Sequence, residues 1–221
     1  MAERSTDRPT ARTGRRERNK QDKLDRIMAA ATALFAEHGV GDVTTQQIAD
    51  RADIGTGTLF LYARTKGELL LMVQNSLYAE ALAKGKAASA DLTDPASALM
   101  ALLGPIVHCN RAQVENGRTY LRELAFGETA EPHREAALAI VAQTSEAVAA
   151  ILVRTGVATA ADAELLAGLI QARMFLAMAA SGPDVAVEEV VGQVAQSVAF
   201  LVRLPTTRPR RPPNGRTAAG G

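Results

Sequence analysis

The chain has 221 residues, enough for one or two domains with a hydrophobic core, and its formal net charge is only +1. Its single cysteine, Cys109, excludes an internal disulfide framework and fits a reducing compartment. No uncharged apolar run reaches about 18 residues and the first residues lack the apolar segment of a secretory signal, so we predict a cytoplasmic protein without a membrane span.

Charge is distributed unevenly along the chain. Residues 1–26 carry nine basic and five acidic side chains, residues 203–221 carry five arginines and no acid, and the segment between them is net −8. A basic end beside an acidic body is typical of a protein whose one end faces a polyanion. We predict that residues 1–19 are a disordered basic arm whose Arg16 and Arg18 reach the minor groove or the phosphates of DNA. The Pro- and Arg-rich residues 205–221 are predicted to be a disordered tail without that role.

The pattern after the arm predicts three helices in quick succession. The first spans about residues 20–38 and stops at Gly39. Thr44 and Gln47 have the T-x-x-Q spacing of a capping box, which starts a second, short helix. Asp53 tolerates the left-handed backbone of a sharp turn, and a third helix of about two turns follows over residues 56–62. Two short helices joined by a tight turn are the unit that sets a helix into the major groove of DNA.

Two residues of this segment suit contact with a sugar-phosphate backbone. Gly57 costs up to about 1 kcal/mol inside a helix, but a helix without a side chain there can approach DNA closely. Lys66 lies at the start of the next helix, where its charge and the nearby N–H groups could hold a phosphate.

Over about residues 24–70 the chain resembles the DNA-binding domain of the TetR family of bacterial transcriptional regulators. The typical pattern is Thr, then Ile-Ala, then Ala-Gly-Val-Ser-x-Gly-Thr-Leu-Tyr-x-Tyr/His-Phe-x-x-Lys-x-x-Leu. The matching positions are Thr44, Ile48, Ala49, Ala52, Gly57, Thr58, Leu59, Tyr62, Lys66 and Leu69. The departures are Asp53 for the turn glycine, Gly55 for the capping serine, Phe60 for the first tyrosine and Ala63 for the phenylalanine. Phe60 lacks a hydroxyl that the family commonly directs at a phosphate.

These residues define the predicted DNA-binding face. The candidates near base edges or the DNA backbone are Thr45, Gln46, Thr56, Leu61 and Tyr62, beside Gly57. The candidates for phosphate contacts or helix caps are Thr44, Thr58 and Lys66. Phosphate contacts position a protein on DNA, whereas base contacts specify the sequence.

The rest of the chain predicts helices and no strand. Their expected ranges are about 66–85, 95–114, 118–127, 132–155, 160–180 and 185–204. Asp94-Pro95 is a cap followed by proline at the first helical position, Pro105 predicts a kink, and Gly117 predicts a helix break. The resulting all-α fold of about nine helices is also what the resemblance implies. Residues 20–65 would be the helix-turn-helix domain and residues 66–204 an effector-binding and dimerisation domain.

The last two long helices indicate a partner. Valines recur at spacings of three and four over residues 187–201, and the helix over 160–180 is apolar around most of its girth. One chain could cover these faces alone, but we favour a homodimeric four-helix interface. Its candidate residues are Leu165, Leu169, Val187, Val191, Val194, Ala195 and Val198.

The helices between the two predicted interfaces are the expected effector chamber. Taken singly, each candidate is more typical of a core or surface position than of a ligand contact. The candidates are Met100, His108, Tyr120, Glu123, Phe126, Met174, Phe175 and Met178. Because no charge cluster is present, we expect a small, largely apolar effector. His108-Cys109, His38 and His133 lack metal-ligand spacing, so no metal and no cofactor are expected.

The sequence therefore favours a DNA-binding transcriptional regulator, and the resemblance implies a repressor that a small molecule releases from a palindromic operator. Two alternatives within DNA binding stay open: a non-specific nucleoid-type protein, and a regulator without a small-molecule effector. An enzyme is not expected, since Gly55-Thr56-Gly57 is followed by Phe60 where a nucleotide loop needs its third glycine.

Overall fold

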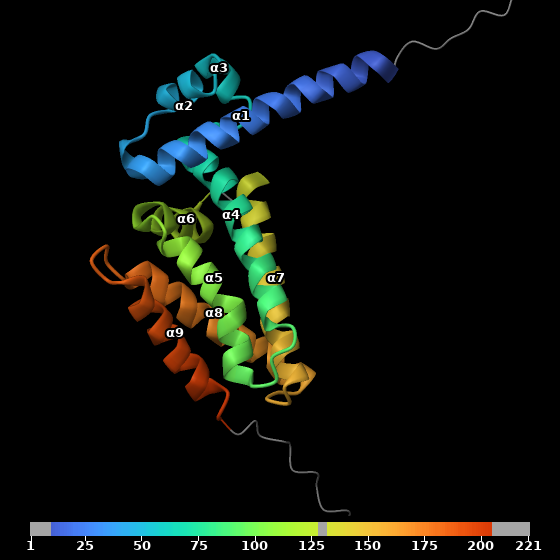
Figure 1. The fold of residues 1–221 in the computed structure, drawn as a ribbon, viewed down its shortest axis with the longest axis vertical. Helices are drawn as coiled ribbons and strands as arrows, with labels where there is room; N and C mark the ends of the chain where they lie inside the picture. The colour runs from blue at the N-terminus through green and yellow to red at the C-terminus, as the bar shows by residue number, and fades with distance from the viewer. Residues whose placement is uncertain (1–9, 128–131, 205–221) are drawn as a thin grey trace, which may run out of the picture.

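A computed structural model describes residues 10–127 and 132–204, and within these ranges the chain is all-helical with no strand. A small helical domain lies at one end and a longer helical body extends from it, with α4 running from one into the other (Figure 1). Residues 1–9 of the predicted arm and the predicted tail, residues 205–221, lie outside the described residues.

Nine helices follow one another in the described part of the chain. They are α1 (Thr10–Asp42), α2 (Thr45–Arg51), α3 (Thr56–Leu59), α4 (Lys66–Ser89), α5 (Pro95–Arg111), α6 (Val114–Phe126), α7 (Pro132–Arg154), α8 (Ala160–Ala180) and α9 (Val187–Leu201).

The first helix begins earlier than predicted. It starts at Thr10, so the described part of the expected arm, with Arg16 and Arg18, is helical rather than disordered. Arg, Glu, Lys and Gln are good helix formers, and the last turn of the arm continues directly into the buried part of α1. Gly39, with φ of 77°, interrupts α1 near its end as the sequence predicted. In Figure 1 the N-terminal part of α1 projects beyond the rest of the domain.

One apolar cluster joins α1, α2, α3 and the start of α4. Its largest fully buried side chains include Ile27, Phe35, Ile48, Leu59 and Leu69. Helices as short as α2 and α3 are marginal in isolation, so packing of this kind supplies most of their stability.

The local signals read from the sequence hold α2 and α3 in place. The Thr44 hydroxyl accepts from the Gln47 N–H at 3.2 Å and the Gln47 side chain accepts from the Thr44 N–H at 2.7 Å, which is the predicted capping box. Asp53 adopts φ of 51° at the turn, and Gly55 is the residue before α3.

The helical body forms around a second, larger apolar cluster from α4 to α9. Helices α4 and α5 pack most closely at Gly85, where an added Cβ would lie 2.3 Å from the carbonyl oxygen of Leu102. The predicted cap at α5 is present, because Asp94 accepts from the Ser97 N–H at 2.8 Å. Helix α5 continues through Pro105 to Arg111.

The break between α5 and α6 lies four residues before the predicted one. Gln113 caps α6, and Gly117 lies inside that helix. An added Cβ at Gly117 would lie 2.1 Å from the Asn110 carbonyl oxygen. The glycine therefore marks a close approach of two backbones, and the prediction that it ends a helix was wrong.

Helices α7 and α8 are each long and apolar enough to cross a membrane by length and composition. Such helices also form the cores of proteins that contain no membrane span, so this is weak evidence. Here α7 and α8 pack against each other and contribute to the core of the body.

Candidate DNA-binding face and effector pocket

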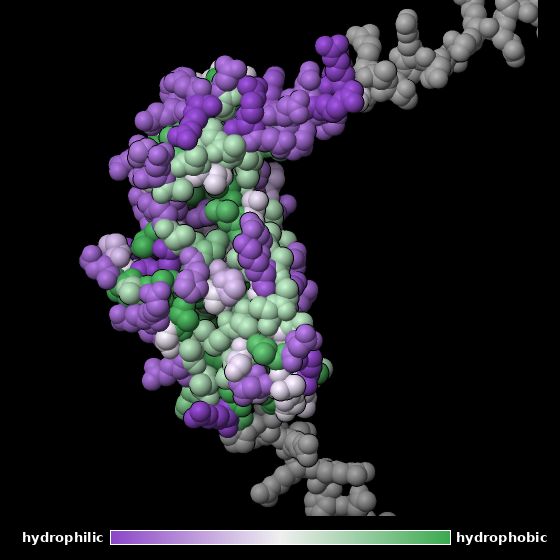
Figure 2. All heavy atoms as spheres, in the orientation of Figure 1, coloured by the Kyte–Doolittle hydropathy of each residue, from purple (hydrophilic) through white to green (hydrophobic). Residues whose placement is uncertain are grey.

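Helices α2 and α3 present the predicted contact residues on one outer surface of the small domain. Leu61, just after α3, is 84% exposed, and a methyl group added at Gly57 would meet no atom within 4 Å. Thr44 and Gln46 are exposed, while Thr45, Thr56 and Thr58 are half-buried. Figure 2 shows hydrophilic side chains over this end of the molecule and along the projecting part of α1, where Arg16 and Arg18 are exposed. The surface thus combines backbone open to close approach with polar and basic side chains.

Side-chain bonds fix the relative positions of α2 and α3. The Thr56 hydroxyl donates to the side-chain Oε1 atom of Gln46 at 2.6 Å, and the side-chain amide nitrogen of Gln46 donates to the Asp50 carboxylate at 2.7 Å. Arg26 of α1 donates to the carbonyl oxygen of Asp53 at the turn, at 3.3 Å. The pair of helices is therefore pre-arranged as a rigid unit.

Two predicted DNA contacts already have partners within the domain. The Lys66 ammonium donates to the carbonyl oxygens of Gly41 and Val43, each at 3.0 Å. It closes the turn between α1 and α2 and keeps one N–H for another acceptor. The Tyr62 hydroxyl donates to the Lys20 carbonyl oxygen at 3.2 Å, which ties the end of α3 to α1.

A cavity of about 330 Å³ lies among α4 to α8 and is called here the inner pocket. None of the residues that line it is charged. They are Tyr78, Ile106, Tyr120, Leu121, Leu124, Ile140, Val141, Thr144, Gly168, Gln171, Ala172, Met174, Phe175 and Met178. Its size and apolar lining fall at the small end of ordinary ligand pockets, which span about 300–1,000 Å³.

Four of the eight predicted ligand residues line the inner pocket, namely Tyr120, Met174, Phe175 and Met178. The other four lie elsewhere. Met100 packs against the core, His108 is exposed on α5, and Glu123 forms an ion pair with Arg122 at 3.5 Å. Phe126 is 85% exposed at the end of α6.

Sequence reasoning missed Tyr78, a pocket residue with an informative context. Its ring stacks on Tyr120 with centroids 4.6 Å apart, and its hydroxyl accepts from the buried Asn110 amide at 2.6 Å. Burial raises the pKa of both tyrosines above the ordinary value, so both hydroxyls stay protonated. Asn110, a polar residue near the end of the mostly apolar α5, was the available signal that a buried polar partner lies nearby.

A chain of hydrogen bonds leads from the inner pocket to the end of α3. The Tyr120 hydroxyl donates to Asn75 on α4 at 2.9 Å, and the Asn75 amide donates to the His133 carbonyl oxygen at 2.7 Å. The Nε2 atom of His133 lies 3.2 Å from the carbonyl oxygen of Tyr62, to which it donates in the Nε2–H tautomer. We call this set of Tyr120, Asn75, His133 and Tyr62 the polar relay.

A second polar contact joins α6 to the end of α1. The buried Asn116 side chain accepts from the Val40 N–H at 2.7 Å and donates to the Phe35 carbonyl oxygen at 2.8 Å. Both backbone groups lie close to Gly39, where α1 is interrupted, so Asn116 fastens α6 to this part of α1.

The predicted dimer residues divide into two groups. Leu165 and Leu169 on α8 are exposed, and Val187, Val191 and Ala195 on α9 are half-buried. Val194 and Val198 are each 1% exposed in the core of the single chain, so we remove them from the predicted interface. Two other large apolar side chains of these helices are exposed but were not among the predicted interface residues: Leu176 on α8 at 59% and Phe200 on α9 at 65%.

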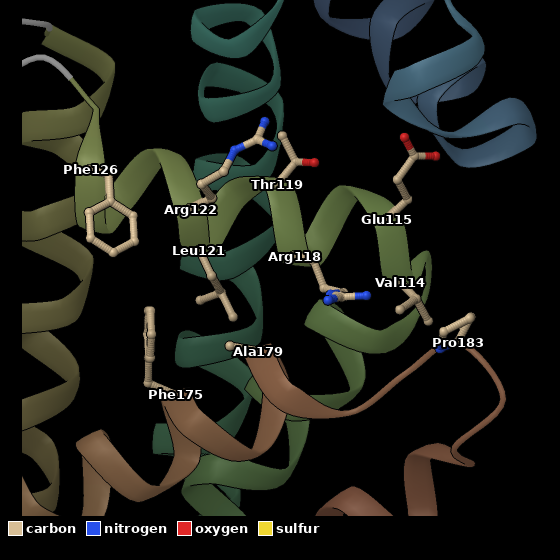
Figure 3. A pocket seen from close by; sticks show the side chains of 10 residues that line it. All are labelled: Val114, Glu115, Arg118, Thr119, Leu121, Arg122, Phe126, Phe175, Ala179 and Pro183. Carbon is tan, nitrogen blue, oxygen red and sulfur yellow. The ribbon is translucent and has the colours of Figure 1, made fainter.

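A second, wider hollow of about 620 Å³, called here the outer groove, lies between α6 and the end of α8 (Figure 3). Leu121, Phe126, Phe175 and Ala179 face one another across it. Leu121 and Phe175 also line the inner pocket, so these two side chains separate the two cavities. Within the described residues, no group of three or more His, Cys, Asp or Glu could hold a metal ion.

Comparison with known proteins identifies the small domain. Residues 27–73 match the family model of bacterial regulatory proteins of the tetR family. No curated protein matches the chain. The resemblance that the sequence indicated is thereby confirmed at the helix-turn-helix segment.

Solved structures share the fold over most of the chain. A TetR transcriptional regulator from Rhodococcus sp. RHA1 has a TM-score of 0.63 at 16% identity, covering 85% of this chain and 98% of that one. FadR from Thermus thermophilus, a TetR-family transcriptional repressor in complex with lauroyl-CoA, has a TM-score of 0.63 at 22% identity and covers 86% and 99%. A TetR-family transcriptional regulator from Streptomyces coelicolor has a TM-score of 0.61 at 21% identity and covers 83% and 95%. These similarities confirm the predicted all-α fold.

Proposed function

We propose that this chain, whose first domain is that of the TetR family of bacterial regulatory proteins, is a cytoplasmic repressor that binds a palindromic operator as a homodimer and is released by a small, largely apolar effector. The single observation that carries the DNA-binding part is the α2–α3 face. The Thr56–Gln46 hydrogen bond fixes α2 and α3 to each other. Gly57 has no side chain, so the α3 backbone is free to approach the sugar-phosphate backbone of DNA closely.

A homodimer follows from the geometry of operator recognition. A short helix on one half-site gives little affinity, whereas two related by a dyad read half-sites about 34–36 Å apart or a multiple of that. The outer stripe of α8 supports this, because Leu165, Leu169 and Leu176 are exposed at positions that share one face of that helix. Large exposed apolar surfaces on one protein commonly mark contacts with another.

The inner pocket is the proposed effector site, and the polar relay is the proposed route to α3. An effector that displaces the Tyr120 hydroxyl breaks its bond to Asn75, which then no longer fixes the His133 carbonyl. The contact between His133 and Tyr62 holds the end of α3 to the body, so its loss frees the small domain to move. Such an effector acts only through its preference for one of the two arrangements.

The Thermus repressor supplies the first effector to try. That protein is described in complex with lauroyl-CoA, and the inner pocket of this chain is apolar enough for a short acyl chain. We assign no catalytic role to the chain.

The test begins with selection of binding sites from random duplex DNA by the full chain. The winners are then titrated against scrambled DNA at two salt concentrations. We expect a palindrome bound about 10³-fold or more above scrambled DNA. The same operator is next titrated with lauroyl-CoA present, and a fall in operator affinity supports release by an effector.

Three other outcomes separate the alternatives. Steeply salt-dependent binding to every sequence would make the chain a nucleoid-type protein. An operator bound equally with and without every effector tried would support a regulator that uses none. An operator without dyad symmetry would contradict the homodimer.

A further inference from the structure

The outer groove has the composition of a binding site for part of a small molecule. Its wall between α6 and α8 is apolar, and Phe126 stays 85% exposed at its rim (Figure 3). The acid among its lining residues, Glu115, points away from this wall toward the end of α1 (Figure 3). A phenylalanine ring left in water forgoes the favourable free energy of burying its apolar surface. A ligand that covers this ring would recover part of that free energy.

Arg118 is the basic group of the groove that has no partner among the described residues. It points into the gap between α6 and the turn after α8, beside Val114 and Pro183 (Figure 3). Arg122, one turn later on α6, is instead paired with Glu123 at 3.5 Å, and in Figure 3 it points away from α8. A free guanidinium beside an apolar wall offers several donors to an anion.

The inner pocket cannot hold that anion. None of its lining residues is charged, and placing a carboxylate or phosphate there without a partner would cost far more than an apolar contact returns. A charged effector must therefore keep its charge outside the inner pocket, on the far side of the partition made by Leu121 and Phe175.

We propose that the effector is an amphipathic anion, whose apolar chain occupies the inner pocket and whose charge is held by Arg118 in the outer groove. This rests on the proposed function and names the chemical class of its effector. Leu121 is 4% exposed and fixed in the core, whereas Phe175 is half-buried. Phe175 is thus the side chain that turns aside when a ligand spans both cavities.

Three probes with the same ten-carbon chain test this: decanoate, 1-decanol and decanoyl-CoA. Each is titrated calorimetrically into the full chain, below its aggregation limit. Because hydrogen bonds to charged groups contribute about 1.5–3 kcal/mol, we expect decanoate or decanoyl-CoA to bind at least about tenfold more tightly than decanol. Tighter binding of decanoyl-CoA than of decanoate would assign the Arg118 contact to a phosphate, and the reverse would assign it to a carboxylate.

Arg118→Gln is the decisive variant and Arg122→Gln its matched control on the same helix. The first should bring both anions to the affinity of decanol, while the second should keep the preference. Equal binding of decanol and the anions by the unaltered chain would overturn the proposal, as would an unchanged preference in Arg118→Gln or no binding of any probe. Thermal melting of both variants checks that the fold is intact.

Failure here is distinguishable from failure of the proposed function. Operator affinity measured without any probe tests the DNA-binding function independently of the outer groove. A chain that binds its operator and is released equally by decanol and decanoate would keep its proposed function and lose the anion site.

Discussion

The contacts inside the small domain and inside the helical body differ in kind from the contacts between these two regions. Each has its own apolar cluster, one around Phe35 and Ile48 and the other around Leu99 and Leu102. Across the junction, besides α4 itself, the contacts include directed hydrogen bonds from Asn116 and from the polar relay. An apolar core resists gradual deformation, whereas a few directed bonds are either made or broken. The junction is therefore the part of the molecule suited to two discrete arrangements.

Removing the junction bonds of Asn116 should have the largest effect on stability. Asn116→Ala leaves the Val40 N–H and the Phe35 carbonyl buried without partners, and each such group costs about 1–3 kcal/mol. We expect the free energy of unfolding, measured in urea, to fall by about 2–6 kcal/mol. The exposed Asn19→Ala on α1 is the control. A decrease in the free energy of unfolding as small as that of the control would mean that water replaces both hydrogen bonds and that solvent reaches the junction.

The same substitution at two glycines should have opposite effects in the two regions. Gly117→Ala places a methyl group against the Asn110 carbonyl in the body, and overpacking of this kind costs about 1–3 kcal/mol. Gly57→Ala meets open space and should raise helix stability by up to about 1 kcal/mol while weakening operator binding. Thermal melting and operator titration check the pair. Unimpaired operator affinity in Gly57→Ala would place that glycine outside the DNA contact.

Cutting the polar relay should weaken communication rather than either region alone. Tyr120→Phe keeps the stacked ring and removes the donor to Asn75, and Asn75→Ala removes both bonds of that residue. Coupling between two sites is typically worth about 1–3 kcal/mol, so we expect the effect of bound effector on operator affinity to fall at least about fivefold. Operator titrations with and without saturating effector measure it. Unchanged coupling in both variants would place the route elsewhere, for example through Asn116.

The smallest expected change concerns Lys66 and distinguishes its two roles. Lys66→Ala should lower affinity for all DNA sequences alike and flatten the dependence of log affinity on log salt by about one unit. It also removes two bonds to the turn after α1, so the melting temperature should fall as well. Lys84→Ala, whose ammonium pairs with Glu80 on α4, is the control and should keep the slope. A melting change without a slope change would show that Lys66 only closes the turn.

Local chemistry was sufficient to predict the small domain. The capping box of Thr44 and Gln47 and the left-handed Asp53 act between neighbours in the sequence, so the sequence displays them directly. The helix boundaries of the body were less accessible. Gly117 was predicted to break a helix because the sequence alone does not distinguish a glycine that ends a helix from one that allows a neighbouring backbone to approach.

For the candidate sites too, the sequence indicated which side chains were candidates but not which of them the packing brings together. Tyr120, Met174, Phe175 and Met178 line the inner pocket, as large side chains on core helices often line a cavity, and their contact with an effector stays a prediction. Met100 and His108 were not placed there, because helical periodicity gives a residue's face but not which neighbour covers that face. Val194 and Val198 shared the apolar stripe of α9, yet the stripe is wide enough for one edge to enter the core.

By itself, then, the sequence predicted the all-α class, the helix-turn-helix segment and the resemblance of that segment to a known family, because these depend on residues a few positions apart. Only the tertiary structure decided that Asn75 and His133 connect Tyr120 to Tyr62, and that Arg118 faces an apolar groove. These features join residues separated by tens of positions. Their proximity results from how the helices pack, and no local pattern records it.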